Sequence, residues 1–142
     1  MSAAQLERAR AHIERNLADL VAWGLLPEVG RAAALSRIHC TTDLAEAAGQ
    51  ADLVVEAVFE DLDLKRHIFA QLDALCPPRT ILGSNTSTFM PGLLAAATGR
   101  PDRVLGIHYF YPPSLLPLVE VIPSRQTAPE VVETVLALLR HA

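Results

Sequence analysis

A histidine and a glutamate stand in two apolar runs that the sequence predicts as neighbouring strands. His108 ends the run 104–108, and Glu120 lies in the middle of the run 118–122. An unpaired carboxylate inside an apolar strand is costly, so we expect Glu120 to be buried against a partner. If residues 112–117 turn the chain back, Glu120 faces His108, fixes the tautomer of its ring and leaves the other nitrogen for acid–base chemistry. A lone histidine at such a place is more often a packed core residue, and the glutamate favours the catalytic interpretation.

Polar residues also follow two earlier apolar runs. Glu60 and Lys65 come after the run 53–58. Acidic residues there equally suit the first turn of a helix, whereas a lysine suits a nearby anion. The stretch Gly83-Ser84-Asn85-Thr86-Ser87-Thr88 follows the run 80–84. It either forms an ordinary turn, because such side chains bond to their own backbone, or presents amide and hydroxyl groups to a ligand, which we favour.

Apolar runs alternate with helical patterns along the chain. The expected helices cover 6–21 (ended by Gly24), 28–36, a short segment from Asp43 to Ala48, the segment of Leu64 to Leu72, a turn opened by Pro91, and 129–140; the expected strands cover 38–41, 53–58, 80–84, 104–108 and 118–122. This alternation indicates an α/β fold with a mainly parallel sheet flanked by helices. In such sheets, sites lie beyond the carboxyl ends of the strands, so the loops after 58, 83 and 108 are the candidate places.

The composition excludes several function classes. Of 142 residues, 51% are hydrophobic and 20% charged, which is typical of a globular domain. The net charge of −4 provides no basic stripe for nucleic acid, and no apolar run is long enough for a membrane helix. The first residues do not resemble a signal peptide, and Cys40 and Cys76 are isolated, so we expect a cytoplasmic protein without disulfides or metal.

Four segments, taken in order, closely resemble one known family. Asp52–Val58, Ser84–Ser87, Gly106–Phe110 and Leu118–Ile122 resemble the NAD-binding domain of L-3-hydroxyacyl-CoA dehydrogenases, enzymes of fatty acid β-oxidation. The resemblance implies a Rossmann-type sheet whose last strand is antiparallel. It also implies one domain over 1–142, with a helical pair in 1–36 and the sheet and active-site half in 37–142.

The resemblance implies NAD-dependent oxidation of an L-3-hydroxyacyl thioester, carried by CoA or acyl-carrier protein, to the 3-oxoacyl thioester. In the matched positions, His108 is the base that takes the proton from the 3-hydroxyl, and Glu120 orients it. The other matches imply contacts with the substrate at Ser87, Asn85 and Tyr111, and with NAD at Ala57, Glu60, Lys65 and Asn85. Tyr111 stands where the family has an asparagine before the proline, which changes the polar lining beside the base.

Two parts of the family pattern have no counterpart in this sequence. No Gly-x-Gly-x-x-Gly is present, so the phosphate-binding loop and the first βαβ unit are missing, and the chain begins, in family terms, just after the second strand. The all-helical C-terminal domain is missing as well. We therefore expect a partial Rossmann-type sheet that binds NAD weakly and has little activity in isolation.

The missing first strand would leave an apolar edge on the strand 53–58, which is a pairing hazard. The segment 38–41, a second copy of the chain or a partner bearing the missing half would have to cover it. We expect a homodimer or a partner chain. Two other functions stay open: a non-redox acid–base enzyme acting on a thioester, and a non-catalytic binding or assembly module that keeps the His–Glu pair as a structural bond.

Overall fold

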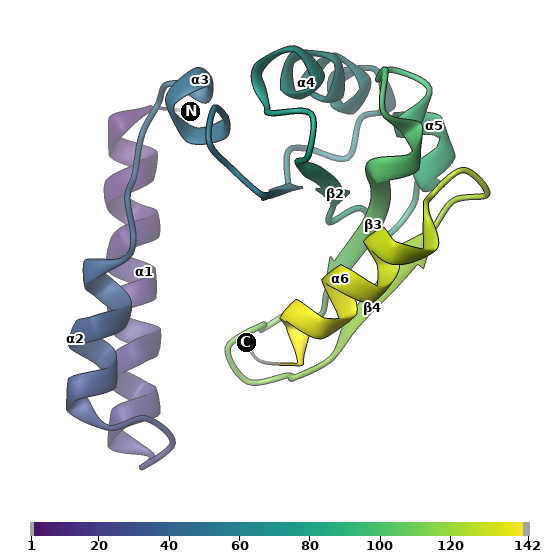
Figure 1. Ribbon diagram of the computed structural model, residues 1–142. Coiled ribbons are helices and arrows are strands. Elements are labelled where there is room, and N and C mark those ends of the chain that lie inside the picture. The colour runs from purple at the N-terminus through teal and green to yellow at the C-terminus, as the bar shows by residue number, and fades with distance from the viewer. Residues whose placement is uncertain (1, 141–142) are drawn as a thin grey trace. The chain divides into compact units, whose positions relative to one another are not determined.

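The computed structural model, which describes residues 2–140, divides after Glu46 into two compact units. The first unit contains two helices that pack side by side, α1 (Ala3–Ala22) and α2 (Glu28–Ser36) (Figure 1). A capping box between Ser2 and Gln5 begins α1. Gly24, with a φ of 72°, follows its last turn in the left-handed conformation that glycine adopts most easily. The predicted helical pair is confirmed.

The strand predicted over residues 38–41 is wrong. Its side chains instead form a local cluster with the start of α3 (Leu44–Ala48), in which the Glu46 carboxylate bonds to His39 Nε2 at 2.8 Å and accepts from Thr41 Oγ1 at 2.6 Å. Thr41 Oγ1 also accepts the Asp43 N–H at 3.0 Å. The hydrogen bond from Thr41, followed by that from His39, lowers the pKa of Glu46. Local bonds of this kind offer the backbone an alternative to strand pairing.

The second unit contains a four-stranded sheet of order β1-β2-β3-β4. Its strands are β1 (Leu53–Glu56), β2 (Ile81–Ser84), β3 (Val104–Tyr109) and β4 (Val119–Pro123), and its helices are α4 (Leu62–Leu75), α5 (Pro91–Ala95) and α6 (Pro129–Leu139), with a 3-10 turn at Pro101–Arg103. β1, β2 and β3 run parallel, and β4 is antiparallel to β3. The predicted α/β fold with an antiparallel last strand is confirmed.

Helices cover both faces of this sheet. Helix α6 lies along β3 and β4 (Figure 1), and its Val131 and Val135 pack on Ile81, Leu105 and Ile107 in one core cluster. A Cβ on Gly83 would lie 2.7 Å from Ile107 Cδ1, so the missing side chain lets Ile107 cross over β2. Helices α4 and α5 pack together on the opposite side. Within the described residues, no helix is long and apolar enough to cross a bilayer.

Candidate active site

His108 and Glu120 lie directly opposite each other in the antiparallel pairing of β3 and β4. His108 Nδ1 is 2.9 Å from Glu120 Oε2. Because a carboxylate only accepts, the neutral ring carries its proton on Nδ1 and its lone pair on Nε2. The ring also packs against Phe110, with 4.9 Å between the ring centroids. The predicted juxtaposition is confirmed, and it leaves one ring nitrogen available for proton transfer.

The expectation that Glu120 is buried is wrong, since its side chain is 52% exposed, against 19% for His108. Val119 and Val121 point to the core cluster under α6, so the alternation along β4 directs Glu120 to the other face of this outermost strand. An ion pair this exposed contributes little to stability. The need to compensate a buried charge therefore does not explain why a carboxylate lies beside His108.

Asn85 links the ends of three strands. Its backbone N–H donates to the carbonyl oxygen of Glu56 at 2.7 Å, and its Oδ1 accepts the backbone N–H of Tyr109 at 2.8 Å. The side-chain oxygen of Asn85 is thus engaged within the protein, and Nδ2 is the group left for a ligand. Ser87, two residues further along this loop, is exposed.

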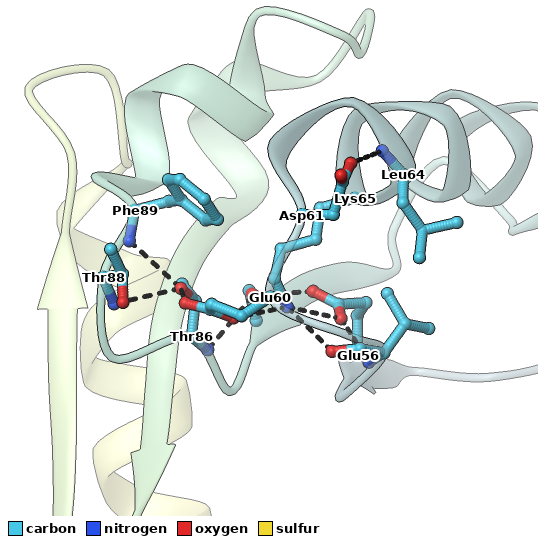
Figure 2. Close-up of polar contacts among 10 residues, drawn as sticks. Glu56, Glu60, Asp61, Leu64, Lys65, Thr86, Thr88 and Phe89 are labelled. Atoms are coloured by element: carbon cyan, nitrogen blue, oxygen red, sulfur yellow. Dashed lines mark hydrogen bonds and ion pairs between the residues drawn. The ribbon is translucent and has the colours of Figure 1, made fainter.

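Lys65 of α4 is buried in a polar network at the end of β1 (Figure 2). Its Nζ lies 2.8 Å from Glu56 Oε1, 3.1 Å from Glu60 Oε2 and 3.2 Å from the carbonyl oxygen of Val58. The side chains of Lys65 and Glu56 are each only 1% exposed. Because an ammonium has three protons and each has an acceptor here, Lys65 presents none to a ligand.

The same network joins the loops that follow β1 and β2. Thr86 Oγ1 donates to Glu60 Oε1 and accepts the backbone N–H groups of Thr88 and Phe89 at 3.2 and 3.0 Å (Figure 2). Burial alone would raise the pKa of Glu60, but hydrogen bonds from Thr86 and Lys65 outweigh it and lower the pKa. The Glu60 carboxylate is thereby held in one position at the carboxyl edge of the sheet.

Sequence reasoning missed Glu56, which is central to this network. Its Oε1 accepts the Val58 N–H at 2.5 Å, and its Oε2 accepts from Ser84 Oγ at 2.7 Å. The bond to Val58 turns the chain, so β1 ends at Glu56 instead of at the predicted residue 58. The signal was present, since Glu56 is a carboxylate in an apolar strand just as Glu120 is.

Other predicted site residues lie apart from these bonded groups. Ala57 is exposed directly after β1, and Tyr111, after β3, is 90% exposed. Within residues 2–140, no hydrogen bond or ion pair joins Ala57, Ser87 or Tyr111 to His108. The structure thus brings together His108 with Glu120, and Asn85 with the end of β3, and leaves the other three open at the surface.

A sequence model described as "3-hydroxyacyl-CoA dehydrogenase, NAD binding domain" matches residues 1–142. The chain belongs to this family. NAD is the cofactor of the domain so described, and the family is one of oxidoreductases. This membership confirms the resemblance that the four sequence segments indicate.

Curated relatives and solved structures agree with this membership. The chain is 37% identical over 133 residues to 3-hydroxybutyryl-CoA dehydrogenase of Clostridioides difficile, covering 94% of this chain and 47% of that protein. It is 41% identical over 133 residues to 3-hydroxyadipyl-CoA dehydrogenase of Escherichia coli, covering 94% and 28%. The crystal structure of 3-hydroxybutyryl-CoA dehydrogenase from Escherichia coli matches with a TM-score of 0.93 at 40% identity, covering 98% of this chain and 29% of that chain. The chain spans less than half the length of each of these relatives.

Proposed function

We propose that this chain supplies the catalytic pair of an NAD-dependent L-3-hydroxyacyl-CoA dehydrogenase. The observation that carries the proposal is the 2.9 Å contact between His108 Nδ1 and Glu120 Oε2 in a partly exposed pair. In the forward reaction, His108 Nε2 takes the proton of the 3-hydroxyl while the hydrogen on C3 leaves as hydride. The C3–O bond becomes a carbonyl, and the product is the 3-oxoacyl thioester. Glu120 orients the ring and favours the imidazolium that forms.

The residues of the carboxyl edge fit the nicotinamide end of NAD. When bound, NAD accepts the hydride. Ala57 has only an exposed methyl group, which lets a planar ring approach, and Glu60 presents the exposed part of its carboxylate. Asn85 offers Nδ2, because its oxygen is engaged. Lys65 acts through Glu60, since its own protons are used inside the protein.

The substrate side is proposed from the open residues of the same edge. The exposed hydroxyl of Ser87 would bind the acyl thioester, and Tyr111 would lie near its path. Relatives are named for 3-hydroxybutyryl-CoA and 3-hydroxyadipyl-CoA, which are both 3-hydroxyacyl thioesters of CoA. We propose this substrate class, a role in fatty acid β-oxidation and a cytoplasmic location for the chain.

Hydride transfer in the purified chain tests the proposal. Acetoacetyl-CoA and a large excess of NADH are mixed with the full chain, and the loss of NADH absorbance is followed. We expect slow turnover that falls by about 10²- to 10⁴-fold in His108→Ala, the usual contribution of a general acid–base residue. His67→Ala is the matched control, since His67 is an exposed histidine of α4. Absence of turnover in the unmodified chain would refute dehydrogenase activity for it.

The same pair favours one other candidate, a non-redox acid–base enzyme acting on a thioester. The His108–Glu120 contact is complete, whereas the sequence has no Gly-x-Gly-x-x-Gly. This candidate predicts exchange of the C2 protons of a 3-oxoacyl thioester with solvent, independent of NAD and lost in His108→Ala. A binding or assembly module instead predicts no chemistry and a loss of stability alone.

A further inference from the structure

The end of β3 that carries His108 extends beyond the ladder with β2. The paired residues of β2 and β3 run from Leu82↔Val104 to Ser84↔Gly106. On the other side, β4 pairs with β3 up to Tyr109. Residues 107–109 therefore pair with β4 on one side. On the other side, the pairing with β2 has ended at Gly106.

A side chain continues the ladder where β2 stops. Asn85 Oδ1 accepts the backbone N–H of Tyr109 at 2.8 Å, in place of the main-chain carbonyl that a longer β2 would offer. Tyr109 directly follows His108, so this bond fixes the backbone next to the candidate base. Asn85 is itself held, because its own N–H donates to the carbonyl oxygen of Glu56 at 2.7 Å.

Glu56 is well suited to act as the anchor of this connection. Its carboxylate is buried and holds Lys65 at 2.8 Å and Ser84 Oγ at 2.7 Å. The bond to Ser84 fixes the last residue of β2, and the main-chain bond fixes Asn85 immediately after it. A buried charge that keeps all its partners permits few alternative arrangements.

We propose that Asn85 and Glu56 are positioning residues for His108. Glu56 fixes the start of the loop after β2, and Asn85 transmits that position to the end of β3 through the Tyr109 N–H. The catalytic meaning of this arrangement rests on the function proposed for His108. The arrangement itself concerns the chain without ligand, so it is testable whether or not NAD binds.

Amide and imidazole NMR of the full isotope-labelled chain tests the proposal. In Asn85→Ala, we expect hydrogen exchange at the Tyr109 amide to be about fivefold faster or more, the factor expected for loss of one ordinary hydrogen bond. The imidazole nitrogen signals of His108 should move as well. Asn85→Asp keeps an oxygen acceptor and should restore the protection of Tyr109.

Glu56→Gln tests the anchor. We expect it to move the same Tyr109 and His108 signals, although within the described residues neither residue is hydrogen-bonded to Glu56. Asp52→Asn is the matched control, since Asp52 pairs with Arg79 at the other end of β1 in an exposed pair 2.8 Å apart. If Glu56→Gln does not fold because buried Lys65 loses one of its two carboxylate partners, Ser84→Ala removes one bond of Glu56 and leaves the ion pair intact.

The outcomes separate positioning from a direct ligand role. Unchanged exchange at Tyr109 in Asn85→Ala would overturn the role of Asn85, and shifts confined to residues 56–65 in Glu56→Gln would overturn that of Glu56. A purely ligand-binding Asn85 would leave the His108 signals of the free chain unmoved in Asn85→Ala. A negative result in the hydride-transfer assay would refute the proposed function and leave the NMR result standing.

Discussion

Glu120 holds the His108 ring from a side chain that is more than half exposed. Its contact can therefore matter for the orientation of the ring and contribute little to the stability of the fold. We predict that Glu120→Gln lowers turnover by about 10²- to 10⁴-fold, because an amide does not stabilise the imidazolium and permits the wrong tautomer. The free energy of unfolding should change by less than about 1 kcal/mol, as for exposed ion pairs. Turnover and urea unfolding of the same preparations check both parts. A variant that loses stability and keeps its turnover would contradict the prediction.

Glu60 gives a pH-dependent prediction. Its pKa is lowered from the ordinary value of 4.5 in the folded chain, so the folded state holds the charged form more strongly than the unfolded state. The associated stability is present above the unfolded pKa and is lost as pH falls through the lower folded pKa. Glu60→Gln should therefore lose less stability than the unmodified chain between neutral pH and pH about 3. The carboxylate is 39% exposed, so the difference should stay below about 1 kcal/mol.

Thermal or urea unfolding as a function of pH measures this difference. Glu130→Gln is a suitable control, since Glu130 is an exposed carboxylate in the first turn of α6. Parallel stability curves for Glu60→Gln and the unmodified chain would show that Glu60 is not held in the charged form.

At the level of elements, β1 presents one side of its backbone to β2 and the other to the edge of the sheet. The carbonyl oxygens of Asp52 and Glu56 accept from the N–H groups of Ile81 and Asn85. Because backbone groups alternate along a strand, Val54 also faces β2, whereas Leu53 and Val55 face the edge. Two neighbouring positions therefore differ in what a proline would remove.

We predict that Leu53→Pro destabilises the fold less than Val54→Pro does, although both lose a partly buried side chain. Proline at 53 removes an edge-facing N–H, which is the position where strands accept proline. Proline at 54 removes a ladder donor and leaves a β2 carbonyl unpaired, at a cost of about 1–3 kcal/mol. Urea unfolding of the two variants tests the difference. Equal destabilisation would mean that β1 faces its neighbours differently from the arrangement inferred here.

The sequence was sufficient for the elements whose signals were local and repeated. Periodic apolar positions predicted α1 and α4, and apolar runs predicted the four strands of the sheet. The error over residues 38–41 arose because Ile38-His39-Cys40-Thr41 resembles a strand, whereas Thr41 and His39 bond to Glu46. Such side-chain bonds depend on a helix that begins several residues later, and no pattern of hydropathy reports them.

The candidate site was predictable to the extent that it depended on strand register. The chain turns back between β3 and β4, and the resulting antiparallel register places His108 opposite Glu120. Burial was not predictable in the same way, since it depends on what covers β4 from elsewhere in the fold. The role of Lys65 was not predictable from α4 alone, because its partner Glu56 lies in β1. A turn separates β1 from α4.

At the scale of the whole molecule, the sheet ends on one side at β1, whose pairing within the described residues is with β2. Leu53 to Val55 are partly buried, and they include neither a charge nor a proline. Natural edge strands usually carry such features, since they prevent pairing with another chain. Within the described residues, the outer edge at Leu53 to Val55 thus lacks the charge and the proline that would oppose its addition to a second sheet.

We therefore predict that the purified chain self-associates through β1. Light scattering and sedimentation over a wide concentration range should show a dimer whose fraction rises with concentration. Leu53→Pro should shift the equilibrium to monomer, because it removes an edge N–H that pairing would use. A second proline variant such as Ala96→Pro is not an equivalent control, because Ala96 lies at the end of α5 and not in a strand. Asp63→Asn, which changes an exposed side chain, serves as the control instead. A monodisperse monomer at every concentration would contradict the prediction, and a dimer that Leu53→Pro leaves intact would place the contact on a surface other than the edge of β1.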